Sequence, residues 1–156
     1  MEILTQENKA LRKRSKRIDK IDDAVRNTTA ALIDLMIKNN GIGLAAPQCG
    51  IQKRIIVVSD NGAIKVFINP EVVFLSEELV EMEEGCLSIP GVYVKKTRPS
   101  SVTIKYRNLA GHPHLETHTG LTARIILHEI DHLDGVLMTD EELAQDEPQL
   151  VAETLE

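Results

Sequence analysis

The segment His128-Glu129-Ile130-Asp131-His132 constrains this chain more than any other part of it. Apolar residues recur from Leu121 to Leu133 and Gly135 follows, so residues 120–134 are predicted to form a helix that ends at this glycine. Side chains four residues apart return to nearly the same face of a helix, so both imidazoles can reach one metal ion. The pattern therefore predicts a helix that carries a metal site.

Glu129 adds a reactive group to this predicted site. It projects to the side of the two imidazoles, where its carboxylate can act as a general base on water without competing for the metal. The three residues together form an H-E-x-x-H motif. Two histidines on an ordinary surface helix are the alternative, but with five histidines in the chain a chance match has a probability on the order of 1%.

A catalytic tetrahedral site needs a third protein ligand and one position left open. The longer metalloprotease pattern H-E-x-x-H-x-x-G-x-x-H matches as far as Gly135 and then meets Met138 in place of the third histidine. A downstream glutamate would have to be Glu153 or Glu156, close to the end of the chain. The glycine before Cys86 permits close approach of the backbone, and Cys86 is the better candidate.

The rest of the chain predicts one more helix and many short strands. Apolar residues from Asp22 to Asn40 recur at helical spacing. Two β-branched runs, Ile55–Val58 and Ala63–Ile68, flank an Asn-Gly pair that is typical of a tight hairpin. Further strands are expected at Glu71–Leu75, Leu79–Glu83, Val102–Arg107 and His114–His118, with a turn at Asn108–Gly111. The fold class is therefore α+β: mainly antiparallel strands around the H-E-x-x-H helix, with an N-terminal helix.

Length and charge narrow the class of protein further. A chain of 156 residues without repeats or linkers predicts a single domain over residues 1–156. No apolar run is long enough to cross a bilayer, and two cysteines are too few for a disulfide framework, so we expect a cytoplasmic protein. The net charge is −6, and no basic residue follows Arg124, which argues against general binding to DNA.

Three segments together resemble the peptide deformylase family. They are Gly41-Ile42-Gly43-Leu44-Ala45-Ala46-Pro47-Gln48, then Glu84-Gly85-Cys86-Leu87-Ser88, then His128-Glu129-Ile130-Asp131-His132-Leu133-Asp134-Gly135. The resemblance runs from about Leu11 to Asp140, and three ordered motifs are highly specific. In the third motif Leu127 stands where glutamine is usual, which removes a polar neighbour of the metal helix.

The resemblance implies a reaction and a role for each residue of the site. The reaction would be hydrolytic removal of the formyl group from N-formylmethionyl peptides. Cys86, His128 and His132 would bind one divalent metal ion, Glu129 would be the acid and base, and Gln48 with the Leu87 backbone N–H would stabilise the oxyanion. Ile42, Gly43, Leu121, Arg124 and Ile125 would lie near the pocket for the first side chain. The family implies Fe(II) as the native metal, and zinc, nickel or cobalt also suit one thiolate and two imidazoles.

Partners and alternatives follow from the same observations. We expect formylated nascent peptides as substrates, no DNA or membrane partner, and contact with the ribosome through the basic N-terminal segment, where residues 1–20 hold seven basic side chains. Glu84, beside the ligand segment, is expected to pair with Arg98. A metallopeptidase and a catalytically silent protein that binds formylated N-termini are the alternative functions.

Overall fold

The Asp60-Asn61-Gly62 segment turns the chain back on itself, as predicted, because Asn61 (φ 51°) and Gly62 (φ 88°) both adopt the left-handed conformation. In the computed structural model, which describes residues 1–140, this turn joins strand β2 (Ile55–Asp60) to strand β3 (Ala63–Leu75). The two strands pair antiparallel, with Asp60 opposite Ala63. The first hairpin of the sheet is thus set by local turn chemistry.

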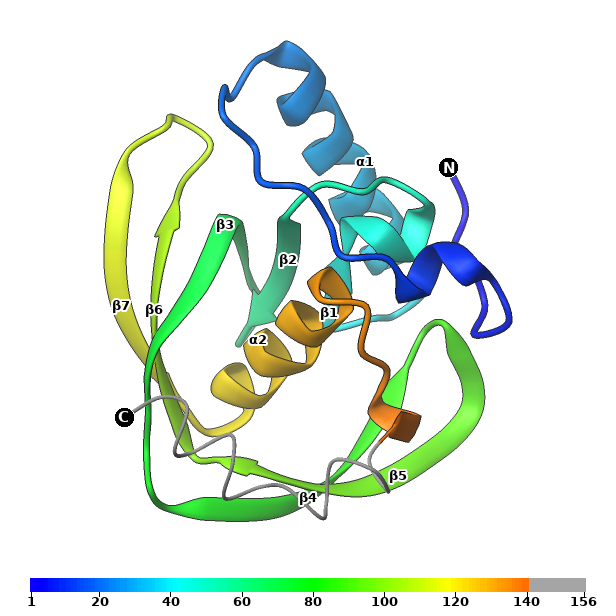
Figure 1. Ribbon diagram of the computed structural model, residues 1–156, viewed down its shortest axis with the longest axis vertical. Coiled ribbons are helices and arrows are strands. Elements are labelled where there is room, and N and C mark those ends of the chain that lie inside the picture. Colours follow the sequence, from blue (N-terminus) through cyan, green and yellow to red (C-terminus); the bar gives the residue numbers. More distant parts are fainter. Residues whose placement is uncertain (141–156) are drawn as a thin grey trace.

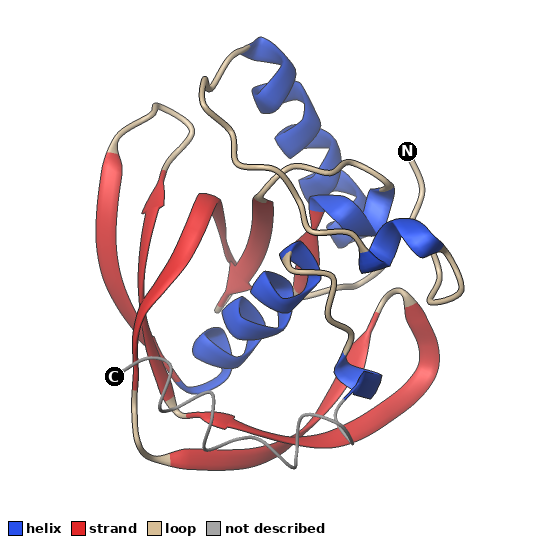
Figure 2. Cartoon of the chain, in the orientation of Figure 1, coloured by secondary structure: helices blue, strands red, loops and turns tan. Residues whose placement is uncertain are grey.

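The strands form a five-stranded antiparallel sheet and a separate hairpin (Figures 1 and 2). The sheet has the order β1-β2-β3-β6-β7, and β4 pairs with β5. This is the α+β architecture that the sequence predicts. The other elements are η1 (Lys9–Arg12), α1 (Asp23–Lys38), β1 (Gly43–Ala45), η2 (Ala46–Cys49), β4 (Leu79–Cys86), β5 (Ile89–Pro99), β6 (Ser101–Arg107), β7 (Pro113–Thr119), α2 (Gly120–Leu133) and η3 (Met138–Asp140).

Strand β3 joins two segments that the sequence analysis treats as separate strands. Its pairing with β6 shifts register between Ile68 and Glu71, around Pro70, which has no N–H to donate to the ladder. Asn69 adopts a left-handed conformation (φ 54°) and its amide binds the backbone N–H and C=O of Ile18. The chain therefore bends at this point without leaving the sheet.

Strands β1 and β5 were not predicted from the sequence. β1 has only three residues, all buried, which is too short to show an alternating pattern. β5 begins with Ile89-Pro90-Gly91 and later carries Lys95 and Lys96, and most of its residues are exposed. Its polar composition concealed a strand that is stabilised by pairing with β4.

Helix α2 lies at the centre of the fold, between the five-stranded sheet and the β4–β5 hairpin (Figure 1). Ile56 and Val58 of β2 face its core cluster, whereas Ile55 and Val57 face the cluster beneath α1. Both faces of β2 are buried, which explains its continuous apolar run. Leu127 also lies in the α2 cluster, so the residue that replaces the usual glutamine contributes to the core.

Residues 141–156 lie outside the described residues. The prediction of one domain over residues 1–156 therefore stays a prediction, and the rejected ligand candidates Glu153 and Glu156 lie in the same segment. Within residues 1–140, neither helix combines the length and the apolar character that crossing a bilayer requires.

Gly135 ends α2 in a left-handed conformation (φ 77°) against the N-terminal segment. A Cβ atom there would lie 2.5 Å from the carbonyl oxygen of Arg12, whereas a Cβ at Gly62 (φ 88°) would meet nothing within 4 Å. We expect Gly62→Ala to lower the free energy of unfolding by about 1 kcal/mol, from backbone strain alone. Gly135→Ala should lower the free energy of unfolding by at least about 2 kcal/mol more than Gly62→Ala does, because the backbone of Arg12 has to move. Urea denaturation measures both, and equal losses would contradict this packing.

Candidate metal centre and active site

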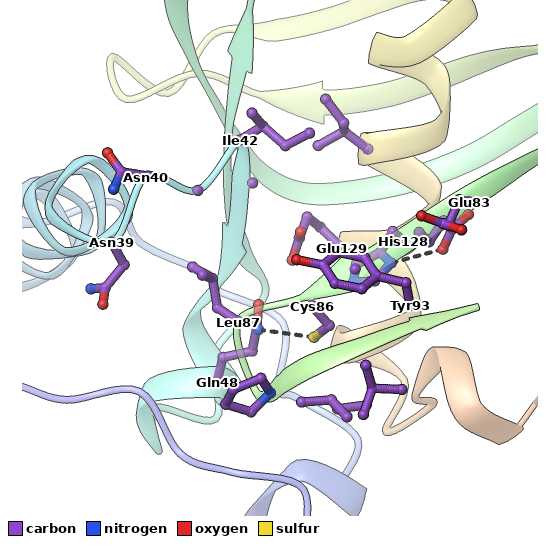
Figure 3. A pocket seen from close by; sticks show the side chains of 18 of the residues that line it. Asn39, Asn40, Ile42, Gln48, Glu83, Cys86, Leu87, Tyr93, His128 and Glu129 are labelled. Carbon is purple, nitrogen blue, oxygen red and sulfur yellow. Dashed lines mark hydrogen bonds and ion pairs between the residues drawn. The ribbon is translucent and has the colours of Figure 1, made fainter. Parts of the chain in front are cut away.

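Three metal-ligating side chains meet at one point of the structure, and Figure 3 shows two of them, Cys86 and His128. Cys86 comes from the end of β4, and His128 and His132 lie one turn apart on α2. Their ligand atoms all lie within 4.8 Å of one another, and His132 Nε2 is 3.3 Å from Cys86 Sγ. Within residues 1–140 this is the one group of its kind. The sequence-predicted ligands are therefore brought together, and a thiolate with two imidazoles is a donor set that suits Zn²⁺ or Fe²⁺.

The tight end of the β4–β5 hairpin places Cys86. The regular pairing ends with Gly85 opposite Tyr93, and after a register shift Cys86 pairs with Ile89, leaving only Leu87 and Ser88 in the turn. The thiol thus projects from a tight turn toward His132 of α2.

Glu84 orients the first histidine. Its carboxylate oxygen Oε1 lies 2.9 Å from His128 Nδ1, which leaves the other ring nitrogen free for a metal. Arg98 donates two hydrogen bonds to the same carboxylate, at 2.6 and 3.0 Å, so the predicted Glu84–Arg98 pair is confirmed. Burial raises the pKa of Glu84, but the hydrogen bonds from His128 and Arg98 outweigh it and hold that pKa well below its usual range. Glu84 is therefore a buried anion.

The electrostatic environment favours a positive charge beside Cys86. Burial lowers the pKa of His128, but hydrogen bonds with Cys86 and Glu84 raise it overall to about 10. Burial and the neighbouring His128 lower the pKa of His132 well below its usual value. The anionic neighbours that favour a proton on His128 equally favour a divalent cation.

Two buried polar atoms at the centre have no hydrogen-bond partner among the described residues: His132 Nδ1 and Glu129 Oε1. Such atoms are costly unless function or a bound group explains them. Glu129 is only 4% exposed, and burial is the main cause that raises its pKa to about 7. A carboxylate poised near neutral pH, with one oxygen unpartnered, has the properties of a general base.

Gly43 makes room for this carboxylate. A Cβ atom at position 43 would lie 2.6 Å from Glu129 Oε2 and 2.6 Å from Ile125 Cγ2. β1 can therefore approach α2 closely only because residue 43 has no side chain.

Gln48 presents its amide to the same centre from η2 and is 1% exposed. Its Oε1 accepts a hydrogen bond from the Ala45 N–H at 2.9 Å, and its Nε2 donates to Ser88 Oγ at 3.1 Å. Nε2 also lies 3.7 Å from Cys86 Sγ. Because both ends of the amide are held, the N–H donors face the metal centre. Ser88 is a part of this arrangement that the sequence analysis did not single out.

A pocket of about 580 Å³ opens beside the ligands. Its walls include Cys86, Leu87, His128, Glu129 and Gln48. All five residues expected near the substrate's first side chain also line it: Ile42, Gly43, Leu121, Arg124 and Ile125. Val92 and Tyr93 of the unpredicted strand β5 form another part of the wall (Figure 3). In the structure the Tyr93 ring covers Gly85 on the paired strand, as aromatic rings often do for strand glycines, but this pairing cannot be read from the sequence.

A half-buried cysteine with two buried histidines, an adjacent carboxylate and an apolar pocket are the features of a metallohydrolase. The polypeptide deformylase family matches residues 1–148, and the chain belongs to this family. Its members are metalloenzymes, and the chain is accordingly a hydrolase that removes the N-formyl group from nascent peptides.

Individual proteins agree with the family assignment. A peptide deformylase of Prochlorococcus marinus is 47% identical over 145 residues, covering 90% of this chain and 72% of that protein. One from Synechocystis is 43% identical, covering 95% of this chain and 80% of that protein. The crystal structure of the Thermotoga maritima peptide deformylase superimposes with a TM-score of 0.87 at 38% identity, covering 89% of this chain and 95% of the other. The crystal structure of a peptide deformylase from Synechococcus elongatus in complex with actinonin gives a TM-score of 0.88 at 41% identity, covering 90% of this chain and 77% of the other.

The close contact at Gly43 yields a prediction. Gly43→Ala should displace the Glu129 carboxylate and lower turnover of a formylated peptide on the order of a hundredfold, because displacement by about 1 Å is enough for such a loss. The backbone at residue 43 is not left-handed, so the contact alone is altered. Steady-state kinetics on metal-loaded protein measure the effect, with circular dichroism and metal content as controls. Turnover within a few-fold of the unaltered protein would contradict the packing.

Proposed function

We propose that Cys86, His128 and His132 hold one divalent cation and that Glu129, Gln48 and the Leu87 N–H carry out deformylation around it. The observation that carries this proposal is the meeting of three ligand atoms within 4.8 Å, beside the unpartnered Glu129 Oε1. When bound, a divalent cation supplies Lewis-acid polarisation and makes water a nucleophile near neutral pH. We propose Fe(II) as the native ion, with zinc, nickel or cobalt as substitutes that the same donor set accepts.

Glu129 is proposed to move the protons of the reaction. Water adds its oxygen to the formyl carbon while the Glu129 carboxylate accepts a proton from it. The carbon–nitrogen bond of the amide then breaks, and Glu129 returns the proton to the departing amine. The products are formate and a free N-terminal amine. A pKa of about 7 suits both directions of this transfer.

Gln48 and Leu87 are proposed to stabilise the negative charge that develops on the formyl oxygen. The amide of Gln48 is held in place by Ala45 and Ser88, so its donor group is oriented before substrate arrives. The Leu87 N–H belongs to the tight turn next to Cys86. Preorganised donors of this kind are the main means by which enzymes stabilise an oxyanion.

The pocket is proposed to take a methionine side chain. Ile42, Gly43, Leu121 and Ile125 give it an apolar wall, which suits an unbranched thioether. β1 is an edge strand of the five-stranded sheet, so its outer edge can pair with an extended peptide. The polypeptide that follows the methionine would then leave the pocket along this edge.

The formyl group, and not an internal peptide bond, is the proposed point of attack. Met138, which occupies the place of the third histidine in the longer metalloprotease pattern, is buried with Leu11, Ile89 and Leu137. It therefore contributes to the core.

A comparison of blocked peptides tests this function. Fe(II)-loaded protein, prepared without oxygen, should release formate from N-formyl-Met-Ala-Ser and leave N-acetyl-Met-Ala-Ser and its internal peptide bonds intact. Cleavage of internal bonds would favour the metallopeptidase alternative. Tight binding of the formylated peptide without release of formate would favour the silent binding protein.

The role of Gln48 gives a separate prediction. Gln48→Ala should lower the turnover number on the order of a hundredfold, because loss of one oxyanion donor costs about 3 kcal/mol of transition-state stabilisation. Metal content should be retained, since Gln48 is not a proposed ligand. Gln52→Ala is the matched control, because Gln52 donates to the Ala10 carbonyl and does not line the pocket. Near-normal turnover in Gln48→Ala would remove this residue from the mechanism.

We further propose that the protein works in the cytoplasm and contacts the ribosome through its N-terminal basic residues. Lys16, Arg17, Lys20 and Lys53 line a second pocket of about 270 Å³. Within residues 1–140 none of these four side chains forms an ion pair. Backbone pairing also places Lys16 beside Lys53. Asp19 and Asp22 line the same pocket and offset part of this charge, so the four cations still leave it net positive. Phosphates of ribosomal RNA would neutralise them.

Charge reversal tests this surface. The triple variant Lys16→Glu, Arg17→Glu and Lys20→Glu should abolish co-sedimentation with ribosomes at low salt, because each lost cation removes a phosphate contact. Reversal of Lys38, Lys95 and Lys105 makes the same change in net charge elsewhere and should have a smaller effect. Formate release from a short peptide should be unchanged in both. Equal ribosome binding by the two variants would contradict the proposal.

A further inference from the structure

The charged end of Arg124 binds the β4–β5 hairpin. We propose that Arg124 is a positioning residue, which holds Glu84 against His128 and fastens the Cys86-bearing hairpin to α2. This inference rests on the proposed metal site and concerns how the chain keeps its ligands in place. Family resemblance puts Arg124 near the substrate pocket, but the structure gives its charged end other partners.

The guanidinium of Arg124 donates three hydrogen bonds, and the residue is only 5% exposed. Its Nη1 donates to Glu84 Oε2 at 2.6 Å and to the Lys96 carbonyl at 3.0 Å, and its Nη2 donates to the Val80 carbonyl at 2.6 Å. Val80 and Glu84 belong to β4 and Lys96 to β5. One side chain from α2 thus binds both strands of the hairpin. Only the remainder of the side chain is available to the pocket wall.

Glu84 has no room to turn once Arg124 is in place. Its Oε2 accepts from Arg124 and from Arg98 Nε, and its Oε1 accepts from Arg98 Nη2 and faces His128 Nδ1 at 2.9 Å. Arg98 lies on β5, so its bonds to Glu84 stay within the hairpin, and it reaches α2 through Asp131 at 3.0 Å. Arg124 and His128 are thus the two residues of α2 that contact the Glu84 carboxylate, and Arg124 is the one that also binds the hairpin backbone.

The spacing of the residues explains why this bond matters for metal binding. Arg124 and His128 are four residues apart on α2 and both contact Glu84. Cys86 lies two residues beyond Glu84 on β4. The separation between the thiolate and the imidazoles is therefore set where Arg124 binds the hairpin. Loss of the Arg124–Glu84 contact should therefore let the two histidines of α2 shift relative to Cys86.

Zinc affinity, measured by competition with a chelator, tests the proposal in Arg124→Lys. Lysine keeps the positive charge next to the site but cannot serve three acceptors from one planar group. Loss of a residue that orients a ligand typically weakens metal binding about 10- to 100-fold. We expect a change in this range, and faster amide hydrogen exchange in the β4–β5 hairpin.

Arg54→Lys is the matched control. Arg54 also binds one carboxylate and two carbonyls, namely Asp134 and Leu133 at the C-terminal end of α2 and Ser15 in the N-terminal segment, and none of them belongs to the β4–β5 hairpin. The Arg54→Lys substitution should lower the melting temperature and leave zinc affinity and amide hydrogen exchange in the β4–β5 hairpin unchanged. If Arg124→Lys does not fold, Arg124→Gln takes its place.

The outcomes separate cleanly. Unchanged zinc affinity in the Arg124 variant, or equal weakening in both variants, would overturn the positioning role. Failure of both Arg124 variants to fold, while Arg54→Lys folds, would also overturn it, because Arg124 would then be required for the fold as a whole. Absence of zinc binding by the unaltered protein would instead contradict the proposed metal site, and hairpin exchange would still report whether Arg124 fastens the hairpin.

Discussion

The buried carboxylate of Glu84 is the group on which the geometry of this protein depends most. A carboxylate that leaves water loses several kcal/mol of solvation unless hydrogen bonds and opposite charges replace it. Here Arg98, Arg124 and His128 replace it, and they come from β5 and from α2. The charge is therefore stable only when the hairpin and the helix are docked together. The same docking brings Cys86 to the two histidines, so the proposed metal site assembles when the hairpin packs against the helix.

Two glutamates near the centre have opposite properties because their surroundings differ. Glu84 has three cationic or donor partners and a strongly lowered pKa, so it stays ionised. Glu129 has an unpartnered oxygen within residues 1–140, and burial raises its pKa to about 7. Different surroundings thus give the two carboxyl groups very different pKa values. One site can therefore hold a fixed negative charge and a group that titrates near neutral pH. Gly43 completes the arrangement, since it leaves space for the Glu129 carboxylate against β1.

Features with a local cause could be predicted from the sequence, and features with a distant cause could not. The H-E-x-x-H helix and the Asn61-Gly62 hairpin follow from spacing and turn chemistry within a few residues. β3 continues past the Asn69-Pro70 bend because it pairs with β6, and β5 forms despite its polar composition because it pairs with β4. Neither partner strand can be identified from the local sequence. The guanidinium of Arg124 lies against Glu84, 40 residues earlier in the chain, and no sequence pattern indicates that contact. Resemblance placed Arg124 at the pocket, but only the structure shows what its charge binds.

We propose that Glu129 transfers the protons of deformylation while Cys86, His128 and His132 hold the metal. Formate release from N-formyl-Met-Ala-Ser by Fe(II)-loaded Glu129→Gln tests it most directly, because the substitution keeps the shape of the side chain and removes the base. We expect metal content equal to that of the unaltered protein and turnover lower by about 10² to 10⁴. Turnover close to that of the unaltered protein, with metal bound, would contradict it.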